Sequence, residues 1–212
     1  MKVFTQNEYS TLKSVMLGCV ENFQWPTNDR EFDNAIARST YHETLESKTL
    51  PDWLTVEATE DLDALEYIMQ DYGIKVYRPT IKGPQWAYSA RDILLTVGDM
   101  IIQCPTPFES RTEEIELYPF LKDCKTIRAP RPTSQEDPCF DAANVLKVND
   151  KLLYSLSHSA NEAGAEWLQQ QVGTEFEVVK WKVVDYDITH IDSTLLTLNE
   201  NTVIVNASRV KE

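Results

Sequence analysis

One pattern, two short apolar runs joined by a polar turn, occurs three times in this chain at a nearly constant interval. The three copies are DILLTVGDMIIQCP (92–105), ANVLKVNDKLLYSLS (143–157) and STLLTLNENTVIVNAS (193–208). Their turns, Gly98-Asp99, Asn149-Asp150 and Asn199-Glu200, use residues typical of tight β-hairpin loops. Leu95, Leu146 and Leu196 precede these turns and lie 51 and 50 residues apart. A period of about fifty residues predicts an array of similar modules, often arranged as a ring.

Helical patterns fill the intervals between the hairpins. SANEAGAEWLQQQVG (159–173) predicts a helix capped by Ser159, with Glu162 completing a capping box and Gly173 ending it. TEDLDALEYIMQDYG (59–73) predicts a second helix with Thr59 as its cap, followed by a strand at 74–77. A weaker helix is expected from near Ser110, ended or kinked by a proline. The expected unit is strand, strand, helix, strand, within one α/β domain spanning residues 1–212.

Polar residues stand at the same place in each module, directly before the hairpin. Asp92 precedes the first hairpin, Asp141 the second, and His190 with Asp192 the third. In a ring of modules these places converge, and in a strand alternate residues share one face, so His190 and Asp192 are expected to enter the same pocket. A single aspartate before a strand is more often a turn or capping residue, and a single histidine is more often structural. The recurrence of acids at one position favours a site.

Composition narrows the classes of partner. The chain has 34 Asp and Glu against 20 Lys and Arg, which gives a net charge of −14. This charge argues against binding to nucleic acid or to anionic membranes and favours a small cationic substrate. The alternative is that the charge serves only to keep the protein soluble. The four cysteines form no C-x-x-C pair and, with His42, His158 and His190, no metal-ligand cluster. We expect reduced core thiols, His42 and His158 as packing or surface residues, and no metal or cofactor. The N-terminus lacks a signal core and no window is apolar enough to span a membrane, so a soluble, cytoplasmic protein is expected.

Several segments carry a family resemblance over nearly the whole chain. NEYSTLKSVMLG, SARDILLTVGDMIIQCPTPFESR, DPCFDAANVLKVNDKLLYSLSHSANEAGAEWLQ and THIDSTLL, in this order, resemble the amidinotransferases of the pentein superfamily, which include glycine and inosamine-phosphate amidinotransferases. The most specific pieces are Arg91-Asp92, Phe140-Asp141-Ala142-Ala143 and His190-Ile191-Asp192. The resemblance implies a β/α propeller-like pentein ring of five ββαβ modules around a polar site. There a cysteine thiolate takes the amidino group of L-arginine, ornithine leaves, and an amine such as glycine receives the group.

The resemblance also implies roles for individual residues. Asp141 and His190 match the catalytic acid and base partners of the nucleophile. Asp92 and Asp192 match the carboxylates that hold the substrate guanidinium, and Arg209 matches the arginine that binds the carboxylate of the donor. These residue types suit the chemistry, because carboxylates bind a planar guanidinium through paired charge-assisted hydrogen bonds and an imidazole exchanges protons near neutral pH.

Two departures from the family pattern bear on activity. The nucleophilic cysteine of the family lies downstream of the His-x-Asp motif, whereas here no cysteine follows Cys139, which itself matches a position that is not the nucleophile. Asn144 stands where relatives often have a second acid. The three hairpins and the strand within TLKSVMLGCV make roughly four modules. The ring is therefore expected to be incomplete at its C-terminus. The missing module is either supplied by a complementing chain or lost from a shortened product. Assembly of the chain into a homo-oligomer is a further possibility.

Three functions follow from these observations. The first is amidino transfer from L-arginine to an amine. The second is hydrolysis of arginine by a deiminase or dihydrolase of the same superfamily, with water as the acceptor. The third is a non-catalytic arginine-binding module that lacks a nucleophile.

Overall fold

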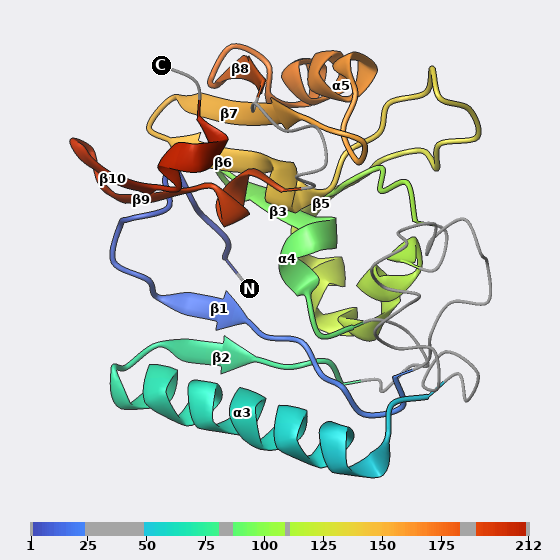
Figure 1. The fold of residues 1–212 in the computed structure, drawn as a ribbon, viewed down its shortest axis with the longest axis vertical. Helices are drawn as coiled ribbons and strands as arrows, with labels where there is room; N and C mark the ends of the chain where they lie inside the picture. The colour runs from blue at the N-terminus through green and yellow to red at the C-terminus, as the bar shows by residue number, and fades with distance from the viewer. Residues whose placement is uncertain (1, 24–48, 81–86, 109–110, 183–189, 211–212) are drawn as a thin grey trace. The chain divides into compact units, whose positions relative to one another are not determined.

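A computed structural model describes residues 2–23, 49–80, 87–108, 111–182 and 190–210 of the chain (Figure 1). Contacts within the chain group into two compact units. Unit 1 comprises Met1–Thr11, Arg91–Pro107 and Phe120–Glu212, and unit 2 comprises Leu12–Ala90 and Phe108–Pro119. The assignment of residues 1–212 to one domain stays a prediction. His42 and Ser110 lie outside the described residues, and so does the prediction made for His42.

Unit 2 contains a two-stranded parallel sheet and a long helix. Strand β1 (Ser14–Met16) pairs with β2 (Lys75–Tyr77), and α3 (Asp52–Asp71) precedes β2 and contacts it. The helix begins earlier than the sequence predicted, directly after Pro51, and Thr59 does not cap it but donates its hydroxyl to the carbonyl of Thr55 at 2.7 Å. The chain leaves the helix through Gly73, whose φ of 76° suits a glycine. In place of the weak third helix stands the short 3-10 helix η3 (Glu114–Leu117).

Unit 1 contains the three predicted hairpins, which are confirmed. Strands β3 (Leu94–Val97) and β4 (Met100–Gln103), β6 (Val145–Val148) and β7 (Lys151–Leu156), and β9 (Leu195–Asn199) and β10 (Thr202–Val205) pair as antiparallel neighbours. Gly98 and Asn149 adopt positive φ angles of 55° and 57° in the first two turns. A third strand joins two of the hairpins in parallel: β5 (Lys125–Arg128) beside β4 and β8 (Glu177–Lys182) beside β7.

Helix α5 (Glu162–Val172) lies between β7 and β8 in the chain and packs against their sheet (Figure 1). It completes the predicted order strand, strand, helix, strand. Its cap is Asn161, whose Oδ1 accepts from the backbone N–H of Gly164 at 2.8 Å, so the prediction of Ser159 as the cap is wrong. Ser159 is instead buried among other hydroxyl groups. Leu168 and Val172 of α5 join a core that includes Leu95, Ile102, Phe140, Val145, Leu152 and Tyr154.

A short helical turn precedes each hairpin. These turns are α4 (Ala90–Ile93), η5 (Ala142–Asn144) and η6 (Ile191–Ser193), and η7 (Ala207–Arg209) follows the last hairpin. The expectation that residues 190–192 continue a strand is therefore wrong. His190 is extended, but the N–H of Thr194 donates to the carbonyl of Ile191 at 2.8 Å and closes a 3-10 turn. Among the described residues, no helix combines the length and apolarity that crossing a membrane requires.

Candidate active site

Asp92, Asp141 and His190 meet in front of the three hairpins, as the repeat predicted. His190 Nε2 lies 3.0 Å from Asp141 Oδ2, and His190 Nδ1 lies 3.8 Å from Asp92 Oδ1. The side chain of Asp141 is fully buried, while those of His190 and Asp92 are 23% and 18% exposed. Three segments spread over about half the chain thus place one imidazole between the buried carboxylate of Asp141 and the partly exposed carboxylate of Asp92.

The surrounding charges favour a protonated His190. Burial alone lowers the pKa of an imidazole, but the hydrogen bond and charge of Asp141, with the charges of Asp92 and Asp192, raise the pKa of His190 above its ordinary value. Burial likewise raises the pKa of Asp192, against the attraction of Arg91 and His190. Protons are therefore held more tightly here than on isolated side chains, a property typical of acid–base sites.

Asp192 and Arg209 lie on the turns that flank the last hairpin. Asp192 Oδ2 is 3.5 Å from Nε of Arg91, and its charge acts on His190. Arg209 donates from Nη1 to both the carbonyl oxygen and the hydroxyl of Ser193 at 3.2 Å. Arg209 is therefore fastened to the turn that carries Asp192. The roles of both residues in substrate binding stay predictions.

A buried polar network, which sequence reasoning missed, holds Asp141 in place. Asn144 Oδ1 accepts from the backbone N–H of Asp141 at 3.0 Å and from the hydroxyl of Ser159 at 3.2 Å, and Asn144 Nδ2 donates to Ser157 at 3.2 Å. An amide supplies both the acceptor and the donor, whereas an ionised carboxylate only accepts, which gives Asn144 a structural reason to replace an acid. The alternating serines Ser155, Ser157 and Ser159 were the available sequence signal.

Comparison with known proteins identifies the family of this chain. Inosamine-phosphate amidinotransferase 1 of Streptomyces griseus is 33% identical, over 99% of this chain and 71% of that protein. A solved structure of an inosamine-phosphate amidinotransferase from the same organism superposes with a TM-score of 0.85, again covering 99% and 71% of the two chains. The chain belongs to the amidinotransferase family. No protein-family model matches it.

Proteins of lower sequence identity are also similar to this amidinotransferase chain over most of its length. The L-arginine:L-lysine amidinotransferase of Pseudomonas savastanoi pv. phaseolicola is 26% identical, over 99% of this chain and 70% of that protein. DDAH from Pseudomonas aeruginosa, at 17% identity, superposes with a TM-score of 0.62 and shares the fold. The predicted α/β pentein fold is confirmed.

The cysteines of the amidinotransferase chain nearest to the site are thiols and not thiolates. Burial, with the charge of Asp141, raises the pKa of Cys139 to about 12, and its Sγ donates to the carbonyl of Ser159 at 3.7 Å. Cys104 is 3% exposed, and burial with the same carboxylate raises its pKa as well. All four cysteines are free, and those with raised pKa values are weak nucleophiles at neutral pH.

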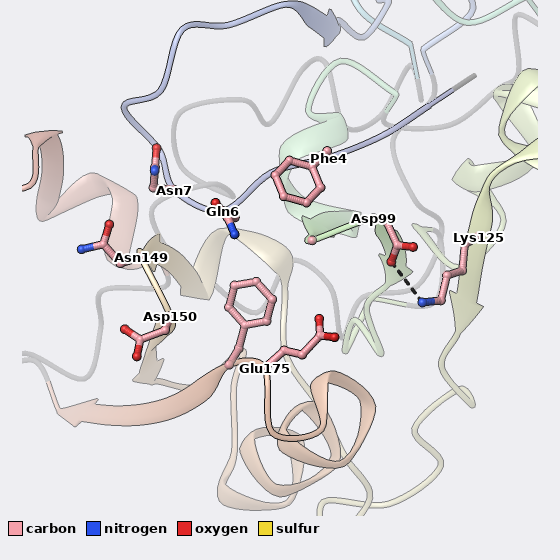
Figure 2. A pocket seen from close by; sticks show the side chains of 10 residues that line it. Phe4, Gln6, Asn7, Asp99, Lys125, Asn149, Asp150 and Glu175 are labelled. Carbon is pink, nitrogen blue, oxygen red and sulfur yellow. Dashed lines mark hydrogen bonds and ion pairs between the residues drawn. The ribbon is translucent and has the colours of Figure 1, made fainter.

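A concavity of about 650 Å³ has a lining that does not include the residues of this site. Figure 2 shows the side chains that line it. It forms where the hairpins turn, beside Asp99 and Asn149, whereas Asp92 and Asp141 precede the opposite ends of the same hairpins. Phe4 and the buried Phe176 also line it, and Lys125 is paired with Asp99 at 3.0 Å (Figure 2). None of the predicted site residues lines this concavity.

Proposed function

We propose that this chain provides the guanidinium-binding and proton-transfer groups of an amidinotransferase that takes the amidino group of L-arginine to an amine such as glycine. The observation that carries the proposal is His190 between Asp141 and Asp92, at 3.0 Å and 3.8 Å. Family membership supports the type of reaction. The acceptor is part of the proposal, since relatives are named for inosamine phosphate, L-lysine and glycine.

In this proposal His190 moves the protons. Asp141 binds Nε2 and fixes the ring, and Nδ1, 3.8 Å from Asp92, is left to face the substrate. The imidazolium gives a proton to the δ-nitrogen of ornithine as its bond to the guanidinium carbon breaks. The neutral imidazole then accepts a proton from the attacking amine, so one group serves both half-reactions. The buried carboxylate of Asp141 stabilises the charged form.

Asp92 and Asp192 hold the guanidinium in this proposal. Guanidinium is planar and presents paired N–H groups, so two carboxylates on different turns can fix its plane for attack. Arg209 binds the α-carboxylate of the donor from η7. With Asp141, the site gathers three carboxylates around His190, which suits a cationic substrate.

The nucleophile remains to be supplied. By resemblance the family forms a covalent adduct on a cysteine thiolate, yet the Cys139 and Cys104 thiols are protonated at neutral pH. We propose that the thiolate comes from a polypeptide outside these 212 residues. The same observation favours a second candidate function, arginine binding without turnover.

Calorimetry and product analysis separate these functions. L-arginine is titrated into the chain and into Asp192→Asn, which is expected to bind at least about tenfold more weakly because a charged hydrogen bond is lost. Asp150→Asn, at an exposed hairpin turn, is the control and should bind as the unmodified chain does. Ornithine is then assayed with glycine, L-lysine or an inosamine phosphate as acceptor.

Each result selects one function. Ornithine with a guanidino product supports amidino transfer, and citrulline formed without an acceptor supports hydrolysis. Binding without product supports the binding module. A chain that does not bind L-arginine at all contradicts the proposed function and its alternatives together.

A further inference from the structure

Arg91 connects the turns before all three hairpins of unit 1. From α4 its Nη1 donates to the carbonyl of Ala142 at 2.9 Å, and its Nη2 donates to the carbonyl of Val145 at 2.8 Å. Its Nε lies 3.5 Å from Asp192 Oδ2. One guanidinium thereby contacts η5, the start of β6 and η6. Arg91 also directly precedes Asp92 in the chain.

These contacts hold the segments that contain Asp141 and Asp192. Ala142 follows Asp141 in the chain, and Val145 is the first residue of β6. We propose that Arg91 is a positioning residue that fixes the carboxylates of Asp141 and Asp192 relative to His190. The proposal deepens the proposed function and rests on it for the identity of the substrate, L-arginine.

The geometry requires an arginine. Its rigid planar group presents five N–H donors in a fork, so it can contact two carbonyls and a carboxylate at once, whereas the ammonium of a lysine is a single point charge. The hydrogen bonds to the two carbonyls fix the orientation of the guanidinium, so that its Nε faces Asp192. Replacement of Arg91 by lysine keeps the charge but should lose the anchoring.

The charge of Arg91 acts on Asp192 as well. Burial raises the pKa of Asp192, and Arg91 is the strongest of the charges that oppose this rise. His190 also lowers that pKa, while Asp92 and Glu8 raise it. Glu8 is itself paired with the buried Lys147 at 2.8 Å. Without Arg91, the pKa of Asp192 should rise further, and a protonated carboxyl cannot hold a guanidinium by charge.

Arg111 serves as a control that separates a role in positioning the site from a general contribution to the stability of the fold. Arg111 of unit 2 also donates to a backbone carbonyl, that of Ser89 at 2.9 Å, and pairs with a carboxylate, Glu114, at 2.9 Å. It is buried and belongs to a different unit from the site. Arg111→Lys should therefore lower the thermal midpoint without changing the titration of Asp192.

The experiment compares Arg91→Lys, Arg91→Gln and Arg111→Lys with the unmodified chain. The Asp192 carboxyl is titrated by NMR without substrate, its signal being assigned by its loss in Asp192→Asn, and the dissociation constant for L-arginine is measured at pH 6 and pH 8. Arg91→Gln should raise the pKa of Asp192 and weaken binding about tenfold or more, with the larger loss at pH 6. Arg91→Lys should bind L-arginine more weakly at both values of pH, with a smaller change in the titration.

Two outcomes overturn the proposal. Either the Arg91 variants titrate and bind as the unmodified chain does, or they lose only thermal stability, as Arg111→Lys is expected to do. If Arg91→Gln fails to fold, Arg91→Lys decides the question. If the unmodified chain does not bind L-arginine, the proposed function fails, while the titration of Asp192 still tests the role of Arg91.

Discussion

At the scale of the residue, neighbouring carboxylates and burial set the protonation of one imidazole, that of His190. Burial opposes the charged form of His190, but Asp141, Asp92 and Asp192 together outweigh that effect and raise its pKa. A histidine whose pKa is raised on folding stabilises the folded state below the unfolded pKa, and this contribution is lost as the pH rises through the folded value. The same balance that suits proton transfer therefore appears in the pH dependence of stability.

Replacement of His190 by glutamine tests this balance. The thermal midpoint of the unmodified chain should exceed that of His190→Gln most at pH values below the ordinary histidine pKa of 6.5, and the difference should shrink as the pH rises above it. Thermal unfolding followed by circular dichroism between pH 5.5 and 9 measures it. His158→Gln, which changes an exposed histidine, is the control. A difference that grows with pH would show that His190 is held in its neutral form.

At the scale of the element, a glycine allows helix α5 to pack against the segment that leads to Asp141. A Cβ at Gly164 would lie 2.5 Å from the Tyr154 hydroxyl and 2.6 Å from the carbonyl oxygen of Cys139. That hydroxyl donates to the carbonyls of Asn161 and Cys139 at 2.9 and 3.2 Å. The close approach fixes residues 139–141 against the helix.

Gly164→Ala should therefore destabilise the chain even though alanine is the better helix former. The expected loss is about 1–3 kcal/mol from overpacking, which outweighs the gain of about 1 kcal/mol in helix propensity. Urea unfolding measures the change, and Gln170→Ala on the exposed face of the same helix should be neutral or slightly stabilising. A more stable Gly164→Ala variant would contradict the described packing.

At the scale of the whole chain, the three hairpins differ in the number of strands paired with them and in the exposure of their apolar side chains. Within the described residues β4 and β7 each have a third strand beside them, and the β9–β10 hairpin consists of two strands. Leu196 and Ile204, which face each other across it, are 49% and 55% exposed, and Leu198, Val203 and Val205 are also exposed. By the register of the pair, Leu196 and Ile204 lie on one face of the hairpin and Val203 and Val205 on the other. Apolar side chains exposed in this way are typical of interaction surfaces or of aggregation. Completion of the ring by another chain stays a prediction.

The apolar hairpin should bind a hydrophobic dye. Leu196→Thr with Ile204→Thr is expected to lower the fluorescence of bound anilinonaphthalene sulfonate by about half, at a cost in stability near 0.5 kcal/mol per substitution, because exposed sites tolerate change. Tyr67→Ser, on the exposed side of α3, is the control for a single exposed aromatic residue. Unchanged dye binding in the double variant would show that this hairpin is covered in solution.

The sequence by itself determined the elements that depend on neighbouring residues. Turn residues such as Gly98 and Asn149 predicted the hairpins, Gly173 predicted the end of α5, and the interval between Leu95, Leu146 and Leu196 predicted the repeat. The repeat also predicted that Asp92, Asp141 and His190 meet, since equivalent positions in similar modules lie at equivalent places. Their chemical roles came from the family resemblance.

Only the tertiary structure decided which groups hold the site together. Arg91 donates to the carbonyls of Ala142 and Val145, which follow it in the chain by 51 and 54 positions. Every residue type has a backbone carbonyl, so no sequence pattern predicts these hydrogen bonds. The cap at Asn161 and the 3-10 turn after His190 were missed for a related reason. In both places several polar residues compete for the same backbone groups, and the packing of distant segments selects between them.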